Sequence, residues 1–384
     1  MNFRSMIGTV QKSEQNAEKN ECRIYVKERE TIMKKSMKIM SAAMSGIMVL
    51  SLAACGGSDV GTTAAKDTTE AASEAKDSTD TQAAQEEKAD GEAYTVGICQ
   101  LVQHDALDAA TEGFKDAITE ALGADAVTFD EQNAQGDSNT CSTIINSFVS
   151  NDVDLILANA TAALQAAQAG TSDIPVLGTS VTEYGVALEI DDFTGTVGSN
   201  ISGTSDLAPL DEQAAMLHEL FPDAKNVGLL YCSAEANSQY QVDTVKAALE
   251  ELGYTCEYYA FSDSNDLSTI VTNAAGACDV IYVPTDNTAA SNTEIINNIC
   301  QPAGVPIVAG EEGICKGCGV ATLSISYYDL GVATGKMAVK ILTGESNVSE
   351  MPIEYAPQFT KKYNPAACEA LGITVPEGYE AIAE

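Results

Sequence analysis

The sequence predicts an α/β protein made of two similar units with parallel strands. From residue 93 onward, short apolar runs alternate with helical patterns, and connections this regular are typical of parallel strands joined by right-handed crossovers. The alternation restarts near residue 206. At 384 residues the chain is also longer than one hydrophobic core usually organises, which favours two lobes with flanking segments.

The first unit, residues 93–205, is built from four strand patterns separated by three helix patterns. The helix patterns lie at 106–122, 140–150 and 161–169, and the strands are expected at Tyr94–Cys99, Ala126–Phe129, Val153–Ala158 and Pro175–Gly178. The first helix has Leu107, Phe114 and Ile118 on one face, which is the pattern of an amphipathic helix.

The second unit, residues 206–324, repeats this order. Helices are expected at 207–221, 236–252, 266–276 and 290–301, and strands at Asn226–Tyr231, Tyr254–Phe261, Asp279–Pro284 and Val305–Ala309. A helix over 327–343, ending at Gly344, and an extended segment Ile353–Phe359 close the chain. We expect residues 325–350 to complete the first lobe and residues 351–384 to return across the hinge.

The segment before the first lobe has the organisation of an exported lipoprotein. Residues 33–54 combine a basic start with an apolar run that is short for a membrane span. The run ends in Leu52-Ala53-Ala54-Cys55 before a glycine, which resembles the lipobox of bacterial lipoproteins. We therefore interpret residues 33–54 as a signal peptide and Cys55 as the lipidation site. An ordinary cleaved signal with an incidental cysteine is the alternative.

The two remaining N-terminal segments are not expected to fold. Residues 1–32 are polar and precede a second methionine with a complete signal, so we interpret them as a non-translated or disordered extension, with translation beginning at Met33. Residues 55–92 are rich in Ala, Thr, Ser, Asp and Glu and lack aromatic residues, which predicts a flexible acidic tether. The protein is then expected on the outer face of the cell membrane, attached through the lipid alone.

The charge of the chain excludes one class of partner. The formal net charge is −36, and every arginine lies before residue 55. A surface this acidic repels phosphate backbones and anionic lipid headgroups, which argues against nucleic-acid binding and electrostatic membrane adhesion.

Cysteines and histidines give weak support for a metal site. Cys315-Lys316-Gly317-Cys318 is a lone C-x-x-C pattern without a second pair or a nearby histidine. A disulfide in a loop at 314–319, or free thiols, is favoured over zinc, and no metal or cofactor is expected. His104 and His218 are the only histidines, and hydrogen bonding is the role we expect for His104.

Polar loops follow the predicted strands in both units. They cover residues 100–105, 159–162, 178–182, 233–238, 284–288 and 310–313. Ligands of open parallel sheets bind beyond the carboxyl ends of the strands, so two such lobes facing each other predict a ligand cleft. For each loop taken singly, capping of the next helix is the favoured role, whereas six such loops at the same sheet edges favour a ligand site.

Several of these segments together resemble one family. Val96–Asp108, Gly113-Phe114, Val181-Thr182, Gly198–Asp206, Tyr231–Ser238 and Pro284–Asn287 are similar to the ABC-type substrate-binding proteins associated with tryptophan and tyrosine uptake. The resemblance implies a type I periplasmic-binding fold, in which two Rossmann-like lobes are joined by three crossings and close over an amino acid. It also implies a monomer that delivers its ligand to a permease and ATPase. Glu183-Tyr184 replaces the Asp-Pro usual in the family.

An amino acid ligand has three groups that the protein must contact: the carboxylate, the ammonium group and the side chain. Without an arginine after residue 55, its carboxylate is expected to meet backbone N–H groups and hydroxyls at helix starts. The candidates for this role are Thr161, Ala162, Ser180 and Thr182; those for the ammonium group are Asp206, Glu235 and Asp286; those for an aromatic side chain are His104, Tyr184, Tyr240 and Tyr327. Further polar candidates at the same loops are Gln103, Ser205, Ser238, Asn287 and Glu311.

Two other functions are alternatives to amino acid binding. An enzyme is disfavoured, because the sequence has no nucleophile elbow, P-loop or H-E-x-x-H pattern. A sugar- or nucleoside-binding lipoprotein of the same fold, or one that presents its ligand to a membrane sensor, stays open, although the absence of tryptophan weakens the sugar version.

Overall fold

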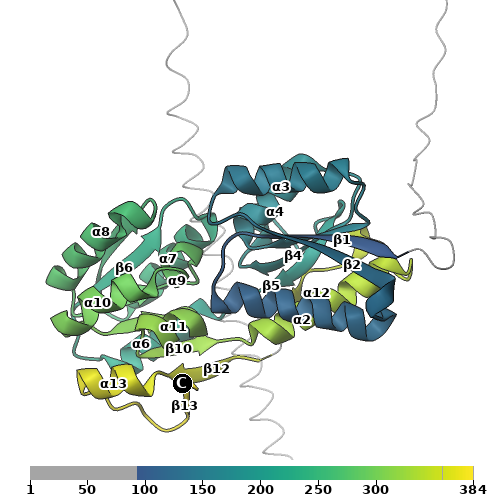
Figure 1. The fold of residues 1–384 in the computed structure, drawn as a ribbon. Helices are drawn as coiled ribbons and strands as arrows, with labels where there is room; N and C mark the ends of the chain where they lie inside the picture. The colour runs from purple at the N-terminus through teal and green to yellow at the C-terminus, as the bar shows by residue number, and fades with distance from the viewer. Residues whose placement is uncertain (1–92, 357, 384) are drawn as a thin grey trace, which may run out of the picture. The chain divides into compact units, whose positions relative to one another are not determined.

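The computed structural model describes residues 93–356 and 358–383, which form two sheets covered by helices (Figure 1). The predicted signal peptide, the lipid anchor at Cys55 and the acidic tether lie outside the described residues. Within the described part, no helix combines the length and the apolar character needed to cross a membrane.

The first lobe contains a six-stranded sheet with the order β11-β5-β4-β3-β1-β2, in which neighbouring strands are parallel. Its strands are β1 (Tyr94–Gln100), β2 (Val127–Asn133), β3 (Leu155–Asn159), β4 (Val176–Val181), β5 (Ile201–Ser205) and β11 (Glu354–Tyr355). Its helices are α2 (Asp105–Leu122), α3 (Ser138–Ser150), α4 (Thr161–Gly170), α5 (Tyr184–Ala187) and α12 (Tyr327–Leu342), with short 3-10 helices at Ala124–Ala126 and Val348–Glu350.

The two faces of this sheet are buried by different helices because side chains alternate along a strand. In β1, Cys99 packs with Ile145 of α3 on one face, whereas Ile98 packs with Phe114 of α2 on the other. Helix α12 lies against α2 (Figure 1). The two helices approach so closely that a Cβ atom at Gly331 would lie 2.0 Å from the Ala110 carbonyl oxygen.

The second lobe contains a seven-stranded sheet with the order β13-β12-β10-β9-β8-β6-β7. Its strands are β6 (Asn226–Cys232), β7 (Thr255–Phe261), β8 (Val280–Val283), β9 (Ile307–Ala309), β10 (Ala321–Ser324), β12 (Thr360–Tyr363) and β13 (Glu380–Ala381). Its helices are α6 (Leu210–Leu220), α7 (Ala236–Glu251), α8 (Ser264–Ala277), α9 (Asn287–Ala290), α10 (Thr293–Ala303), α11 (Glu312–Cys318) and α13 (Pro365–Leu371). The pairing of β10 with β12 is antiparallel.

The chain passes between the two sheets three times. It crosses after β5, between β10 and α12, and between β11 and β12. Helix α12 and strand β11 therefore belong to the first lobe although they follow the second one in sequence. This topology confirms the predicted class of two α/β lobes with mainly parallel sheets and a three-crossing hinge.

Strand β5 was not predicted, because its sequence Ile-Ser-Gly-Thr-Ser lacks an apolar run. All five of its residues are buried, and their hydroxyls find partners inside the lobe. The Thr204 Oγ1 atom lies 2.8 Å from Thr334 Oγ1 of α12 and 3.3 Å from Thr179 Oγ1 of β4. Buried hydroxyls that pair with one another replace apolar side chains here.

One prediction for the second lobe was wrong. The segment expected as a cysteine-containing loop, 314–319, is instead largely helix α11, with Cys315 and Cys318 buried in the core. The helix predicted over 290–301 is confirmed as α10, which begins three residues later, and the short helix α9 precedes it. All nine cysteines from Cys99 to Cys368 are free thiols, and no group of residues suited to a metal ion occurs in the described ranges.

Candidate functional site

A narrow cavity lies where the carboxyl ends of strands from both sheets come together. Its volume is about 10 Å³, which is room for about one water molecule, so the lobes must move apart before a larger ligand can enter. Its lining comes from both lobes and consists of His104, Leu107, Ser180, Asp206, Asn237, Thr285, Asp286, Asn287, Ala290, Glu311 and Tyr327. This is the position that the polar loops predicted, because ligand sites of parallel sheets lie beyond the strand ends.

His104 connects the lobes across this cavity. It precedes α2 in the first lobe, and its Nε2 atom lies 3.2 Å from the Oδ1 atom of Asn287 in the second lobe. The Asn287 Nδ2 group donates a hydrogen bond to Glu235 at 2.7 Å. Burial lowers the pKa of His104, although the contact with Asn287 opposes this change. The other ring nitrogen, Nδ1, is buried and has no hydrogen-bond partner among the described residues.

Asp206 lies at the first crossing between the lobes, directly after β5. Its Oδ2 atom accepts a 2.9 Å hydrogen bond from the hydroxyl of Tyr327, which begins α12 just after the second crossing. Its Oδ1 atom is buried without a hydrogen-bond partner in the described part of the chain. Burial raises the pKa of Asp206, and the Tyr327 and Thr182 hydroxyls partly oppose that rise.

The other three carboxylates around the cavity are already engaged by backbone N–H groups at helix starts. Asp286 accepts from Ala289 N at 2.8 Å and from Cys232 N at 2.6 Å, and burial raises its pKa to about 8. These two bonds use both carboxylate oxygens. Asp286 is therefore the N-cap of α9 and links the end of β6 to the start of this helix.

Glu235 and Glu311 have the same kind of role. Glu235 accepts from Asn287 N at 3.0 Å and from Thr288 N at 2.9 Å, and so holds the start of α9 from the neighbouring loop. Glu311 accepts from Gly313 N at 2.6 Å and from the backbone N–H of Ile314 at the start of α11. Burial raises the pKa of Glu311 to about 7.

Ser180 is the neutral donor of the first lobe that lines the cavity, whereas the predicted contacts Thr161, Ala162, Thr182 and Ser205 are not among the lining residues. The Ser180 hydroxyl is buried and without a hydrogen-bond partner among the described residues, and its backbone has a left-handed φ of +54°. Thr161 is buried and Ala162 is partly buried in the first turn of α4, where backbone N–H groups lack intrahelical partners. Ser205 supports this wall, because its hydroxyl donates to the Thr182 carbonyl at 2.7 Å.

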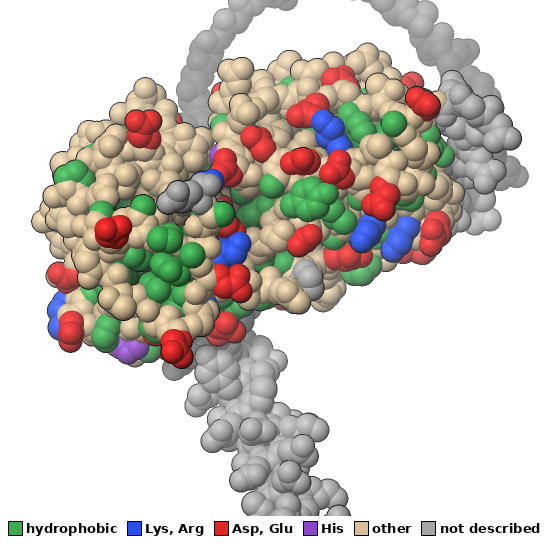
Figure 2. Space-filling model, turned by 60° about the horizontal axis from the view of Figure 1, so that its bottom comes forward, with side chains coloured by type: hydrophobic (Ala, Val, Ile, Leu, Met, Phe, Trp, Pro, Cys, Tyr) green, Lys and Arg blue, Asp and Glu red, His purple; other side chains and the backbone are tan. Residues whose placement is uncertain are grey.

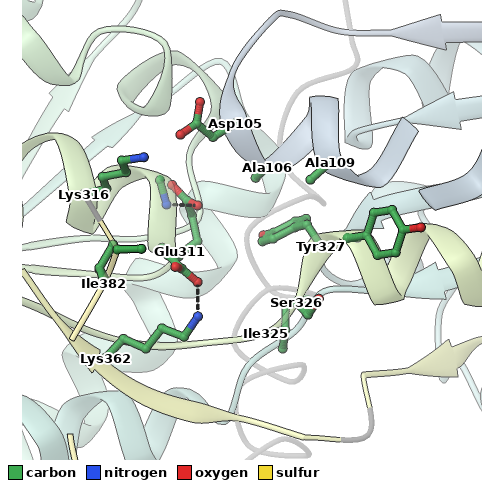
Figure 3. Close-up of a pocket in the computed structure, with 14 residues that line it drawn as sticks. Asp105, Ala106, Ala109, Glu311, Lys316, Ile325, Ser326, Tyr327, Lys362 and Ile382 are labelled. Carbon is green, nitrogen blue, oxygen red and sulfur yellow. Dashed lines mark hydrogen bonds and ion pairs between the residues drawn. The ribbon is translucent and has the colours of Figure 1, made fainter. Parts of the chain in front are cut away.

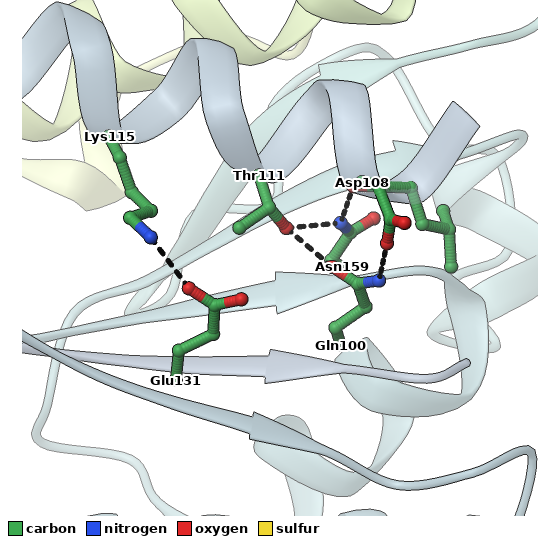
Figure 4. A network of polar contacts seen from close by, with 7 residues as sticks. Gln100, Asp108, Thr111, Lys115, Glu131 and Asn159 are labelled. Carbon is green, nitrogen blue, oxygen red and sulfur yellow. Dashed lines mark hydrogen bonds and ion pairs between the residues drawn. The ribbon is translucent and has the colours of Figure 1, made fainter. Parts of the chain in front are cut away.

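A buried network fixes the start of α2, which carries His104 and Leu107 (Figure 4). The Asn159 side chain donates to the Leu107 carbonyl at 2.9 Å and to the Thr111 hydroxyl at 2.9 Å. Gln100 accepts from Thr111 at 2.7 Å and donates to Asp108 at 2.6 Å. These contacts hold α2 on the ends of β1 and β3.

Several candidates from the sequence do not reach the cavity. Tyr184 is 1% exposed and packs in the core of the first lobe, with its hydroxyl donating to the Thr204 carbonyl at 3.1 Å. Gln103 is exposed and borders a separate surface pocket. Tyr240 is partly buried in α7 and is not among the lining residues. Ser238 is buried beside Asp286 and supports that carboxylate.

Four lining residues were not among the predicted contacts: Leu107, Asn237, Thr285 and Ala290. Asn237 and Thr285 lie within polar loops that the sequence did single out. Leu107 and Ala290 are apolar residues within the predicted helices, and nothing in the sequence distinguishes them from core residues.

A wider pocket adjoins the cavity and shares Glu311 and Tyr327 with it (Figure 3). Its volume is about 340 Å³, and it is lined by both signs of charge, including Asp105, Lys316 and Lys362. Lys362 pairs with Glu312. In contrast, no lysine or arginine of the described chain lines the narrow cavity. Acidic side chains also outnumber basic ones on the face in Figure 2.

The chain is similar to proteins of one family over nearly all its described length. The family model described as ABC transporter substrate binding protein matches residues 95–384. A curated relative, "Tyrosine-binding protein" of Clostridioides difficile, is 33% identical over 327 residues, which cover 84% of this chain and 88% of the relative.

Two solved structures are similar in both sequence and fold. One is an ABC domain in complex with L-Trp from Streptococcus pneumoniae, which is 32% identical with a TM-score of 0.72 and covers 76% of this chain and 100% of its own. The other is the ligand-free, open structure of a Clostridium difficile substrate-binding protein, which is 36% identical with a TM-score of 0.59 and covers 76% of this chain and 99% of its own.

Proposed function

The chain belongs to the family of ABC transporter substrate-binding proteins, and from this premise we propose that it captures an aromatic amino acid in the cavity between its lobes. One observation carries the proposal. Three buried polar atoms without hydrogen-bond partners among the described residues, His104 Nδ1, Ser180 Oγ and Asp206 Oδ1, come from residues that line a single cavity. Buried polar atoms are normally hydrogen-bonded, so their gathering here favours a polar ligand.

In this proposal each group of the amino acid meets a different part of the lining. The ammonium group pairs with Oδ1 of Asp206, which forms a charge-assisted hydrogen bond. The carboxylate accepts from the Ser180 hydroxyl and from the free N–H groups at the start of α4, near Thr161 and Ala162. The side chain packs against the apolar part of the wall, formed by Leu107 and Tyr327.

The aromatic class of the ligand is supported by the relatives. One similar protein is named for tyrosine and another was solved with L-Trp. Moreover, this chain superposes better on the L-Trp complex than on the ligand-free, open structure, although the latter is more similar in sequence. A lobe arrangement closer to the ligand-bound one explains this order.

We further propose that the protein works outside the cytoplasm as a monomer, anchored by a lipid on Cys55, and hands its ligand to the permease and ATPase of an importer. The extracytoplasmic location is that of its family. The anchor is supported by the lipobox-like sequence before Cys55.

A ligand screen by thermal shift tests the proposal. We expect L-tyrosine or L-tryptophan to raise the melting temperature, because a ligand at about 100 times its Kd stabilises the folded state by about 2.7 kcal/mol. For a folded part of this size that corresponds to a rise of about 4 °C. Asp206→Asn should abolish the rise, whereas Asp211→Asn, at an exposed position of α6, should keep it. A response to sugars or nucleosides alone would refute the proposal.

A further inference from the structure

We propose that the cavity recognises the ammonium group of its ligand more strongly than the carboxylate, so that aromatic amines without a carboxylate, such as tyramine and tryptamine, also bind there. This inference rests on the proposed function, because it concerns the same cavity. It follows from which of the unpartnered atoms can donate a hydrogen bond and which can only accept one.

The first acceptor is Asp206. Of the three carboxylates that line the cavity, Asp286 and Glu311 use both oxygens at helix starts, and Glu235 beside the cavity does the same. Asp206 alone keeps an oxygen free, and the hydroxyl of Tyr327 holds its other oxygen in place at 2.9 Å. An ionised carboxylate can only accept hydrogen bonds, so Oδ1 calls for a donor on the ligand.

The second acceptor is the Nδ1 atom of His104. The Asn287 amide is oriented by its Nδ2 group, which donates to Glu235 at 2.7 Å, so its Oδ1 atom faces His104 and accepts. The Nε2 atom of His104 must therefore carry the proton and donate. In the neutral ring that burial favours, the opposite nitrogen then has only a lone pair. Nδ1 thus also calls for a donor on the ligand.

The carboxylate of an amino acid has fewer hydrogen-bond donors available to it in this cavity. Ser180 is the one lining residue of the described chain whose side-chain hydroxyl is both unpartnered and able to donate. No lysine or arginine of the described residues lines the cavity, and a helix start supplies only about half a positive charge.

The balance of these groups therefore favours a cation. Two fixed acceptors suit the three N–H donors of an ammonium group, whereas one hydroxyl and a helix start suit a carboxylate. Removing the carboxylate from the ligand loses the weaker set of contacts and also removes a negative charge from an acidic cavity. Removing the ammonium group leaves the Oδ1 atom of Asp206 buried without a donor, which carries the larger penalty.

Calorimetry with three matched ligands tests this inference. L-tyrosine, tyramine and 3-(4-hydroxyphenyl)propionate share one ring and differ in the charged groups. We expect tyramine to bind within tenfold of L-tyrosine and the propionate to bind at least 100-fold more weakly. The series of L-tryptophan, tryptamine and 3-indolepropionate repeats the comparison.

The outcomes separate this inference from the proposed function. If the amino acid binds and the amine is more than 100-fold weaker, or if the propionate binds as well as the amine, the inference is wrong while the proposed function stands. If none of the six compounds binds, the proposed function fails and the inference fails with it.

Two variants supply an independent check. Asp206→Asn preserves the shape of the side chain and should weaken tyramine at least 100-fold. Ser180→Ala should weaken L-tyrosine by about tenfold and change tyramine less than twofold, because only the amino acid uses that hydroxyl. Equal losses for both ligands in Ser180→Ala would contradict the assignment of donors and acceptors.

Discussion

Replacement of Glu311 by glutamine is expected to change how the free energy of unfolding depends on pH. The Glu311 carboxyl group is 2% exposed and caps α11 through the N–H groups of Gly313 and Ile314. Burial raises its pKa from 4.5 to about 7, although the two hydrogen bonds oppose this change. A glutamine keeps the size of the side chain and one acceptor oxygen but cannot ionise.

The sign and the size of the effect follow from this pKa. Between pH 4.5 and 7 the folded protein holds a proton on Glu311 that the unfolded chain has lost. Stability from this group is therefore complete below about pH 4.5 and is lost as the pH rises through about 7. At about 1.4 kcal/mol for each pKa unit, the whole shift corresponds to about 3 kcal/mol.

Urea unfolding at pH 5 and at pH 8 measures the effect. We expect the unchanged protein to lose about 2 to 3 kcal/mol more than Glu311→Gln between these two conditions. Glu312→Gln is the matched control, because that side chain is partly exposed and pairs with Lys362, and it should follow the unchanged protein. The buried carboxyl group of Asp286 has the same sign of pH dependence but is present in all three proteins. Equal pH differences for Glu311→Gln and the unchanged protein would refute the reasoning.

Three further predictions concern binding and packing. The affinity for L-tyrosine should fall as the pH is lowered from 8 to 5, because burial raises the pKa of Asp206 and only its ionised form pairs with an ammonium group; calorimetry that found one affinity at both pH values would contradict this. Tyr327→Phe should move the midpoint of that pH profile upward, since it removes a hydroxyl that stabilises the ionised form; an unchanged midpoint would exclude the role. Gly331→Ala should destabilise the protein by about 2 kcal/mol or more, because its Cβ atom would meet the Ala110 carbonyl oxygen at 2.0 Å, whereas Gly276→Ala has open space in α8 and should be neutral or stabilising in urea unfolding.

The sequence was sufficient to predict the two α/β lobes, because the signal for each buried strand and amphipathic helix is local. Runs such as Val153–Ala158 and the helical spacing over 106–122 are properties of a few neighbouring residues. The meeting of the polar loops at the carboxyl edge of each sheet could also be predicted from the sequence, because the ends of parallel strands lie at one edge. Local patterns failed where burial was achieved by hydroxyls, as in β5, and where the carboxylate at Glu311 started a helix that its composition did not suggest.

The tertiary structure alone decided which of the predicted polar residues are available to a ligand. Asp206, Glu235 and Asp286 were equal candidates in the sequence, yet only Asp206 keeps an unpartnered oxygen. Glu235 is committed to the start of α9, more than fifty residues away in sequence, and Tyr184 is packed inside the first lobe. The physical reason is that a carboxylate satisfies its lone pairs with whatever donors lie nearest in space. Sequence reports the residue types at the sheet edges, whereas their free hydrogen-bonding capacity depends on contacts that form only when distant segments fold together.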